Sequence, residues 1–241
     1  MVIDIEALRA RIKDSYKSLS SYEDSGTIRR IEFGPERIGW FKTYFLKPNQ
    51  VRFEWAGTEG EEDKSVLIVK GSKAQLHLST WTLKLKKGKI KKIREFEEVM
   101  DLSTAMSMAG DKTQGVSDTF LPLLVENSGR PCFLDNKLAL LRDEWVDDEP
   151  CYQMQELSVF GPRTIWVSQN DFTIRRCHIE GPPPFVTFPA GMIMARRTIV
   201  DHKSLPPEVT NLNLNSQEWL FRSVQYNQLT EDSAPLFSFK C

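Results

Sequence analysis

The sequence has little of what nucleic-acid-binding, membrane-spanning and secreted proteins display. Its 32 basic and 33 acidic residues leave a formal net charge of −1, which argues against the basic excess that nucleic-acid binding usually needs. No apolar run approaches the roughly 20 residues of a membrane-spanning helix. Acidic residues stand near the start, where a signal peptide would place basic and then apolar ones. We therefore expect a cytoplasmic protein, or an exported one whose signal is absent from this sequence.

Histidine is scarce, and the common catalytic signatures are missing. The chain contains three histidines, His77, His178 and His202, and no HExxH or GxSxG motif. His77 alternates with Leu76 and Leu78, so it points outward if these leucines point inward. A metal or acid–base role for His178 with His202 is the alternative to ordinary surface or strand histidines. We expect no enzyme, no catalytic residue, no cofactor and no metal site.

The four cysteines do not form a recognisable site. Cys132, Cys151, Cys177 and Cys241 have irregular separations, and no pair has the CxxC spacing of a zinc or redox centre. Buried or free thiols are the expected state. One structural disulfide is the alternative if the protein is exported, because disulfides persist in oxidising compartments.

Two runs of like charge indicate hairpins. The acidic run Asp143–Glu149 lacks the spacing and the glycine of a calcium-binding loop, so it predicts a solvated turn. The basic run Lys84–Arg94 has two interpretations. Lysines on a protruding hairpin protect its edges from pairing with other strands. Alternatively, they attract an anionic membrane surface or an acidic partner, at about 1 kcal/mol for each lysine near a charged bilayer.

What the chain does contain is a repeated pattern of short aromatic and β-branched runs joined by turn residues. Trp40–Leu46, Val51–Trp55 and Thr164–Ser168 show it most clearly. In Val51–Trp55 the apolar residues alternate with charged ones, as in a strand with one buried face. The pattern predicts a strongly curved antiparallel sheet with large side chains on its inner face. Further strands are expected at Thr27–Phe33, Ser65–Val69, Ala74–Thr80, Trp81–Leu85, Ile90–Ile93, Lys137–Trp145, Pro150–Val159, Phe172–Glu180, Arg196–Asp201 and Glu218–Tyr226, with turns that include Gly161–Pro162.

Helices are expected at the start of the chain and between two sheet-forming halves. Apolar residues from Ile5 to Leu19 recur at three- and four-residue steps, with Asp4 as a plausible N-cap. A helical insertion is expected over about 95–125, with one helix from Glu95 to near Gly110 and a second over Ser117–Val125. The region of about 181–241 is expected to be irregular. With no internal repeat, the chain is interpreted as one domain, residues 1–241.

Three stretches resemble the bacterial lipoprotein-localisation carrier superfamily, which includes the periplasmic lipoprotein carrier and its outer-membrane receptor. Tyr16–Gly26 is similar to the opening helix and first strand of that family. Phe41–Trp55 is similar to its strand, proline turn and following strand. Asp148–Met154, together with Ile165–Arg176, is similar to its later hairpin. The resemblance implies a mainly β fold with α, in which helices cover the concave face of an unclosed β-barrel. It also implies a cavity that shelters acyl chains, and a periplasmic location.

A concave apolar face suits a non-enzymatic protein that binds or carries the acyl chains of lipids or lipoproteins. Each buried methylene group adds roughly 0.8 kcal/mol, so binding needs few polar contacts. Methionine is flexible and suits a lid over varied apolar partners. The candidate cavity residues are Phe41, Phe45, Phe53, Trp55, Ile68, Leu76 and Leu78, and the candidate lid residues are Met100, Met106 and Met108. The alternative is a protein-interaction module with a self-filled core, which would use Lys84–Arg94 or Gly181–Phe185 as its contact surface.

Overall fold

The structure is a computed structural model, and it describes most of the chain. The described residues are 3–31, 36–57, 64–79, 82–86, 89–93, 96–113, 115–158, 161–180, 186–187, 192–195, 198–201 and 216–238. The Gly181–Phe185 segment, His202 and Cys241 lie outside these residues. The structural statements that follow concern the described part of the chain.

The first helix, α1, forms where the apolar stripe predicts it. It spans Ile5–Ser18, and the Asp4 side chain accepts a hydrogen bond of 2.8 Å from the backbone N–H of Ala7, which confirms the predicted N-cap. Leu8, Ile12 and Tyr16 are its buried residues. These three side chains lie one turn apart, so α1 presents one apolar face to the rest of the protein.

Most strands join one antiparallel sheet. The strands are β1 (Ser21–Ile31), β2 (Arg37–Leu46), β3 (Gln50–Ala56), β4 (Ser65–Lys70), β5 (Lys73–Leu78), β6 (Thr82–Lys86), β7 (Lys89–Ile93), β8 (Phe96–Asp101), β9 (Leu138–Leu140), β10 (Glu144–Val146), β11 (Glu149–Ser158), β12 (Gly161–Ser168), β13 (Ile174–Glu180), β14 (Val186–Thr187), β15 (Met192–Ala195), β16 (Thr198–Asp201) and β17 (Ser216–Tyr226). The 12-stranded sheet runs in the order β10-β11-β12-β13-β17-β1-β2-β3-β4-β5-β8, with β9 paired to β11. Because β10 and β8 are the two ends of this order, the barrel is unclosed, as predicted.

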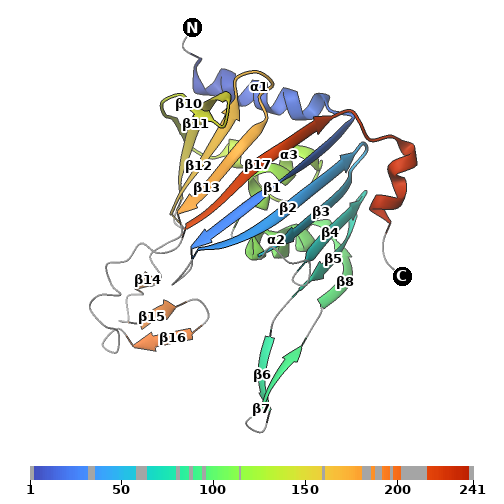
Figure 1. Ribbon diagram of the computed structural model, residues 1–241, viewed down its shortest axis with the longest axis vertical. Coiled ribbons are helices and arrows are strands. Elements are labelled where there is room, and N and C mark those ends of the chain that lie inside the picture. Colours follow the sequence, from blue (N-terminus) through green and yellow to red (C-terminus); the bar gives the residue numbers. More distant parts are fainter. Residues whose placement is uncertain are drawn as a thin grey trace.

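Strand β17 connects the two halves of the sheet. It pairs with β13 on one side and with β1 on the other, where Tyr22 lies opposite Tyr226 (Figure 1). A bulge between Ser25 and Gly26 interrupts the register. A Cβ atom at Gly26 would lie 2.0 Å from the carbonyl oxygen of Leu220 and 2.6 Å from the ring of Phe41. Glycine is therefore needed there for the two strands and the ring to pack closely.

Two helices lie against one face of the sheet (Figure 1). They are α2 (Leu102–Lys112), which Asp101 caps, and α3 (Ser117–Leu124). The prediction of α3 is confirmed, but the expected start of the insertion is wrong. Residues Phe96–Asp101 form the edge strand β8, which pairs with β5, and the helix begins only at Leu102. The methionines near these residues gave a helical pattern, but pairing with β5 satisfies the backbone of this segment.

Two further boundaries differ from the predictions. Gly161 and Pro162 belong to β12, where Pro162 lies opposite Leu157. The expected strand Lys137–Trp145 is divided into β9 and β10. The acidic turn is confirmed, because Asp147 and Asp148 connect β10 to β11. A short 3-10 helix, η2 (Phe133–Asp135), follows α3, and a second one, η4 (Glu231–Phe237), lies over β3 and β4 near the C-terminus.

The concave face of the sheet is packed with aromatic rings. Phe53 stacks on Trp55 at a centroid distance of 4.9 Å, and Phe41 lies 4.8 Å from Trp219. Phe120 of α3 meets Phe53 edge-on at 5.5 Å. Such pairs add about 0.5–1.5 kcal/mol beyond their area burial. The helix α3 thus places a ring directly into the aromatic face of the sheet.

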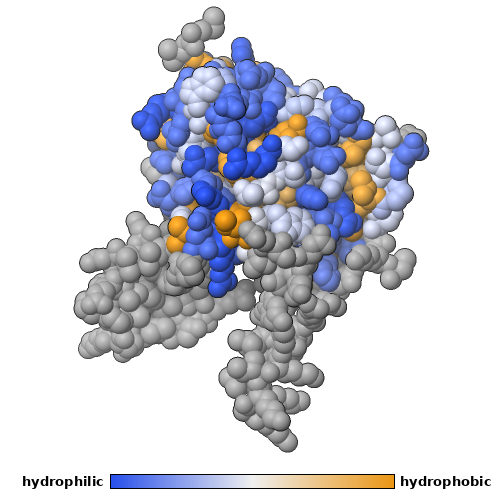
Figure 2. All heavy atoms as spheres, viewed as in Figure 1, coloured by the Kyte–Doolittle hydropathy of each residue, from blue (hydrophilic) through white to orange (hydrophobic). Residues whose placement is uncertain are grey.

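The opposite side of the sheet is mainly polar. Figure 2 shows hydrophilic residues over most of the visible face, with hydrophobic residues in small groups. Trp40 lies there beneath the ammonium groups of Lys42 and Lys64, at 5.8 and 5.9 Å from its ring centre. Among the described residues, no helix has the length and apolarity needed to cross a membrane.

Candidate functional site

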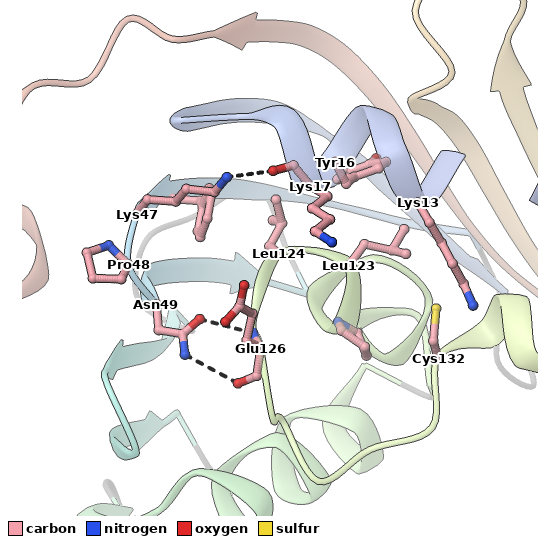
Figure 3. Close-up of a pocket in the computed structure, with 12 residues that line it drawn as sticks. Lys13, Tyr16, Lys17, Lys47, Pro48, Asn49, Leu123, Leu124, Glu126 and Cys132 are labelled. Atoms are coloured by element: carbon pink, nitrogen blue, oxygen red, sulfur yellow. Dashed lines mark hydrogen bonds between the residues drawn. The ribbon is translucent and has the colours of Figure 1, made fainter. Parts of the chain in front are cut away.

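A surface pocket of about 350 Å³ lies between α1, the β2–β3 turn and the C-terminal end of α3 (Figure 3). Its volume is at the lower end of the range for small-molecule sites. The lining residues are Lys13, Tyr16, Lys17, Phe45, Lys47, Pro48, Asn49, Pro122, Leu123, Leu124, Glu126 and Cys132. Residues from three separate parts of the chain therefore meet at this site.

The inner wall of the pocket is apolar. Tyr16, Phe45 and Leu124 are buried and belong to the main hydrophobic core. Leu123 and Cys132 are half-buried and pack against the same core. Burial raises the pKa of the Cys132 thiol, so this group stays protonated at neutral pH. The pocket is thus a depression in the surface whose floor is formed by core side chains. This apolar floor is a surface on which a hydrocarbon chain can lie.

The rim of the pocket carries the charges. The Lys13 ammonium lies 2.7 Å from the Asp135 carboxylate, and this hydrogen bond raises the pKa of Lys13. The Lys47 ammonium donates a hydrogen bond of 2.5 Å to the carbonyl oxygen of Lys17, in the last turn of α1. A cation there offsets the negative end of the helix dipole. In the described part of the chain, the side chains of Lys17 and Glu126 have no hydrogen-bond or ion-pair partner.

Asn49 connects the sheet to the end of α3. Its side-chain nitrogen donates to the carbonyl oxygen of Glu126 at 3.3 Å, and its oxygen accepts from the backbone N–H of Glu126 at 3.0 Å (Figure 3). Asn49 adopts a positive φ of 45°, which asparagine tolerates better than most residues. The pair holds α3 against the β2–β3 turn, at the edge of the pocket.

Beneath the floor lies a buried polar cluster. The ring of Tyr16 is 5.9 Å from that of Tyr22, whose hydroxyl donates a 2.5 Å hydrogen bond to Asp24. Asp24 is 1% exposed, and its burial raises the pKa of the carboxyl group to about 7, although the hydrogen bond from Tyr22 opposes this shift. Burial also raises the pKa of Tyr22 well above its usual value. A carboxyl group on the concave face is therefore largely protonated below neutral pH.

No family model and no curated protein matches the sequence. Solved structures do match. An uncharacterized conserved protein from Thermus thermophilus is similar with a TM-score of 0.51 and 9% identity, over 98% of this chain and 93% of that one. A LolA superfamily protein from Nitrosomonas europaea has a TM-score of 0.36 and 12% identity, over 96% of this chain and 97% of that one. Lipoprotein LppX from Mycobacterium tuberculosis has a TM-score of 0.41 and 12% identity, over 94% and 98%.

Two of these structures are a LolA superfamily protein and a lipoprotein, but their TM-scores lie below 0.5. At these identities the likeness concerns the fold alone. The Thermus thermophilus protein, which has the highest TM-score of the three, shares the architecture over nearly its whole length.

The predicted cavity residues are almost all on the concave face. Six of them belong to the main core, namely Phe41, Phe45, Phe53, Trp55, Leu76 and Leu78. The predicted lid residue Met106 belongs to the same core. Met100 and Met108 are partly buried and pack against that core. Met100 lies on β8 opposite Ala74, on the sheet itself. Ile68 is also buried, but it lies on the other face of the sheet. It pairs with Arg52, next to the Phe53–Leu67 pair, and neighbouring residues of a strand point to opposite faces.

Phe45 is the one predicted cavity residue that lines the surface pocket. Sequence reasoning missed Lys13, Lys17, Leu123 and Glu126, because a pocket between a helix, a turn and a second helix has no periodic signal. A partial signal was present. The apolar stripe of α1 identified Tyr16 as inward-facing, and lysines at positions 13 and 17 necessarily flank it on the helix surface.

Of the histidines that the sequence singled out, the structure describes His77 and His178, whereas His202 lies outside the described residues. His77 lies between the inward-facing Leu76 and Leu78, as predicted. His178 lies 3.9 Å from Glu180, and burial lowers its pKa. Cys132, Cys151 and Cys177 are free thiols, as the first interpretation expected. Within the described ranges, no group of three or more metal-ligating side chains comes together.

Proposed function

We propose that the protein binds and carries acyl chains of lipids or lipoproteins without transforming them, and that the chain enters through the pocket between α1 and α3. One observation carries this proposal: the pocket floor consists of side chains of the same core that lines the concave face. A hydrocarbon chain lying on Tyr16, Phe45 and Leu124 would gain roughly 0.8 kcal/mol of binding free energy for each methylene group that it buries. We propose a periplasmic location on the resemblance to lipoprotein carriers.

The aromatic face itself is filled by α3, so longer chains require this helix to move. Phe120 occupies the space between Phe53 and Phe221, at centroid distances of 5.5 and 5.6 Å. We propose that the pocket receives the first part of a chain and that displacement of α3 admits the rest. The Asn49–Glu126 hydrogen bonds would then break during loading.

Titration with a fluorescent fatty acid, together with native mass spectrometry of the purified protein, tests the proposal. Saturable binding and a co-purifying lipid are the expected results. Leu123→Trp fills the pocket and should weaken binding at least about tenfold, which corresponds to losing roughly two buried methylene groups. Leu141→Trp is the matched control, since Leu141 is exposed and does not line the pocket. Absence of both lipid and saturable binding would rule out the proposal.

A second candidate function is a protein-interaction module, and the register of β6 and β7 favours it. In this two-stranded ladder Lys84 lies opposite Lys91, and Lys86 opposite Lys89. Lysines gathered on one hairpin attract an acidic partner through charge complementarity. The double variant Lys84→Glu/Lys91→Glu should abolish pull-down of poly-glutamate, used as an acidic polypeptide probe, if this hairpin binds acidic protein partners. Unchanged capture of this probe would exclude the role.

A further inference from the structure

The pocket carries two opposite charges that do not pair with each other. The Lys17 side chain extends from α1 and the Glu126 carboxylate from the segment after α3, so that they reach the pocket from opposite sides (Figure 3). Both residues are exposed. No ion pair joins them, and no other described residue neutralises either side chain.

Two other lysines lie on the rim. Lys13 is paired with Asp135, whereas Lys47 donates a hydrogen bond to the carbonyl oxygen of Lys17, which holds its ammonium group beside the end of α1 without cancelling its charge. The end of α1 therefore has the ammonium groups of Lys17 and Lys47 beside it, and Glu126 supplies a carboxylate across the apolar floor. This arrangement is complementary to a molecule with an apolar chain and both an acidic and a cationic group in its head.

We propose that the pocket binds a single-chain amphiphile with a zwitterionic head group, whose acidic group lies against Lys17 and whose ammonium lies against Glu126. This proposal rests on the proposed function, because it names the class of ligand whose chain enters the same pocket. The apolar floor supplies most of the affinity, and the two charges select the head group. A purely anionic or purely cationic head satisfies one charge and meets repulsion from the other.

Displacement of a bound fluorescent fatty acid by four amphiphiles of equal chain length tests this selection. The probes are dodecylphosphocholine, dodecanoate, dodecyltrimethylammonium and dodecanol; the first three are used below the concentrations at which they form micelles, and dodecanol below its solubility limit. In the wild-type protein dodecylphosphocholine should bind most tightly. Its expected advantage over dodecanol is about fivefold for each ion pair, as follows from about 1 kcal/mol for unit charges 4 Å apart in water.

Two variants should shift the preference in opposite directions. Lys17→Gln should weaken dodecanoate about fivefold and strengthen dodecyltrimethylammonium, whereas Glu126→Gln should do the reverse. Neither should alter dodecanol binding. Lys73→Gln, at the exposed first residue of β5, is the matched control and should leave all four affinities unchanged. If either side chain had only a structural role, its substitution would change the affinities for all four ligands equally.

The outcomes separate this inference from the proposed function. If all four amphiphiles bind with equal affinity, or if both variants leave the order of affinities unchanged, head-group selection is wrong and acyl-chain binding stands. If none of the four displaces the fluorescent fatty acid while the fatty acid itself binds saturably, the pocket is not its site and the inference fails. If the fatty acid does not bind at all, both proposals fail.

Discussion

The buried carboxyl group of Asp24 should make the stability of the fold depend on pH. The folded state raises its pKa from 3.8 to about 7, mainly through burial. Since the folded-state pKa lies above the unfolded one, protonated Asp24 stabilises the fold fully below about pH 4, and this contribution is lost as the pH rises to about 7. At about 1.4 kcal/mol for each pKa unit, the loss is on the order of 4 kcal/mol.

Asp24→Asn tests this reasoning, because asparagine keeps the shape and an acceptor for the Tyr22 hydroxyl but does not titrate. Urea unfolding measured between pH 4 and 8 should show that the difference in free energy of unfolding between variant and wild type changes by about 4 kcal/mol over this range. An unpaired amide N–H costs about 1–3 kcal/mol, so the variant should be less stable at pH 4 and more stable by about 1–3 kcal/mol at pH 8.

Asp14→Asn is the control, since Asp14 is exposed on α1 and its substitution should leave the pH profile unchanged. Two profiles that run parallel for wild type and Asp24→Asn would refute the reasoning. That result would mean that the Asp24 carboxyl group has similar proton affinities in the folded and unfolded chains.

Three further predictions follow from the packing. Phe120→Ala should lower the free energy of unfolding by about 3–5 kcal/mol and should tighten fatty-acid binding. Leu236→Ala is the exposed control and should do neither. Unchanged fatty-acid affinity in Phe120→Ala would argue against α3 as a lid. Asn49→Gly keeps the positive φ but removes both hydrogen bonds to Glu126, so thermal or urea unfolding should show a loss of about 1–2 kcal/mol. Cys177 should react with a thiol reagent only on unfolding, since burial raises its pKa to about 11, and rapid labelling of the native protein would contradict its place in the core.

Much of the fold could be predicted from the sequence because local patterns determine it. The alternation in Val51–Trp55 predicted both the strand and the face of it that is buried. The apolar stripe of α1 predicted which side of the helix faces the core. The segment Phe96–Asp101 could not be assigned correctly, because its strand conformation depends on pairing with β5, which no local pattern encodes. Ile68 shows the same limit. In β4 the five residues before Lys70 are all buried, so hydrophobicity alone does not reveal which face they share.

The candidate site was less accessible to sequence reasoning. Its apolar floor overlaps with the core, so Phe45 was predicted as a cavity residue for its burial alone. The charged rim depends on how α1, the β2–β3 turn and α3 meet, and this is a property of the tertiary structure. Lys17 and Glu126 are unremarkable surface residues in sequence, and only their position across one pocket gives them a proposed role.

The pairing of β1 with β17 also determines when the protein can fold. The register places Tyr22 opposite Tyr226, so strands from opposite ends of the chain form the middle of the sheet. On the ribosome, β1 is made before β17 and must wait for the intervening residues 32–215 before its partner emerges. During that time both β1 and β13 have an unpaired edge, which can pair with other chains. Contacts so distant in sequence also slow folding, so we expect the nascent protein to be exposed to aggregation until β17 has been made.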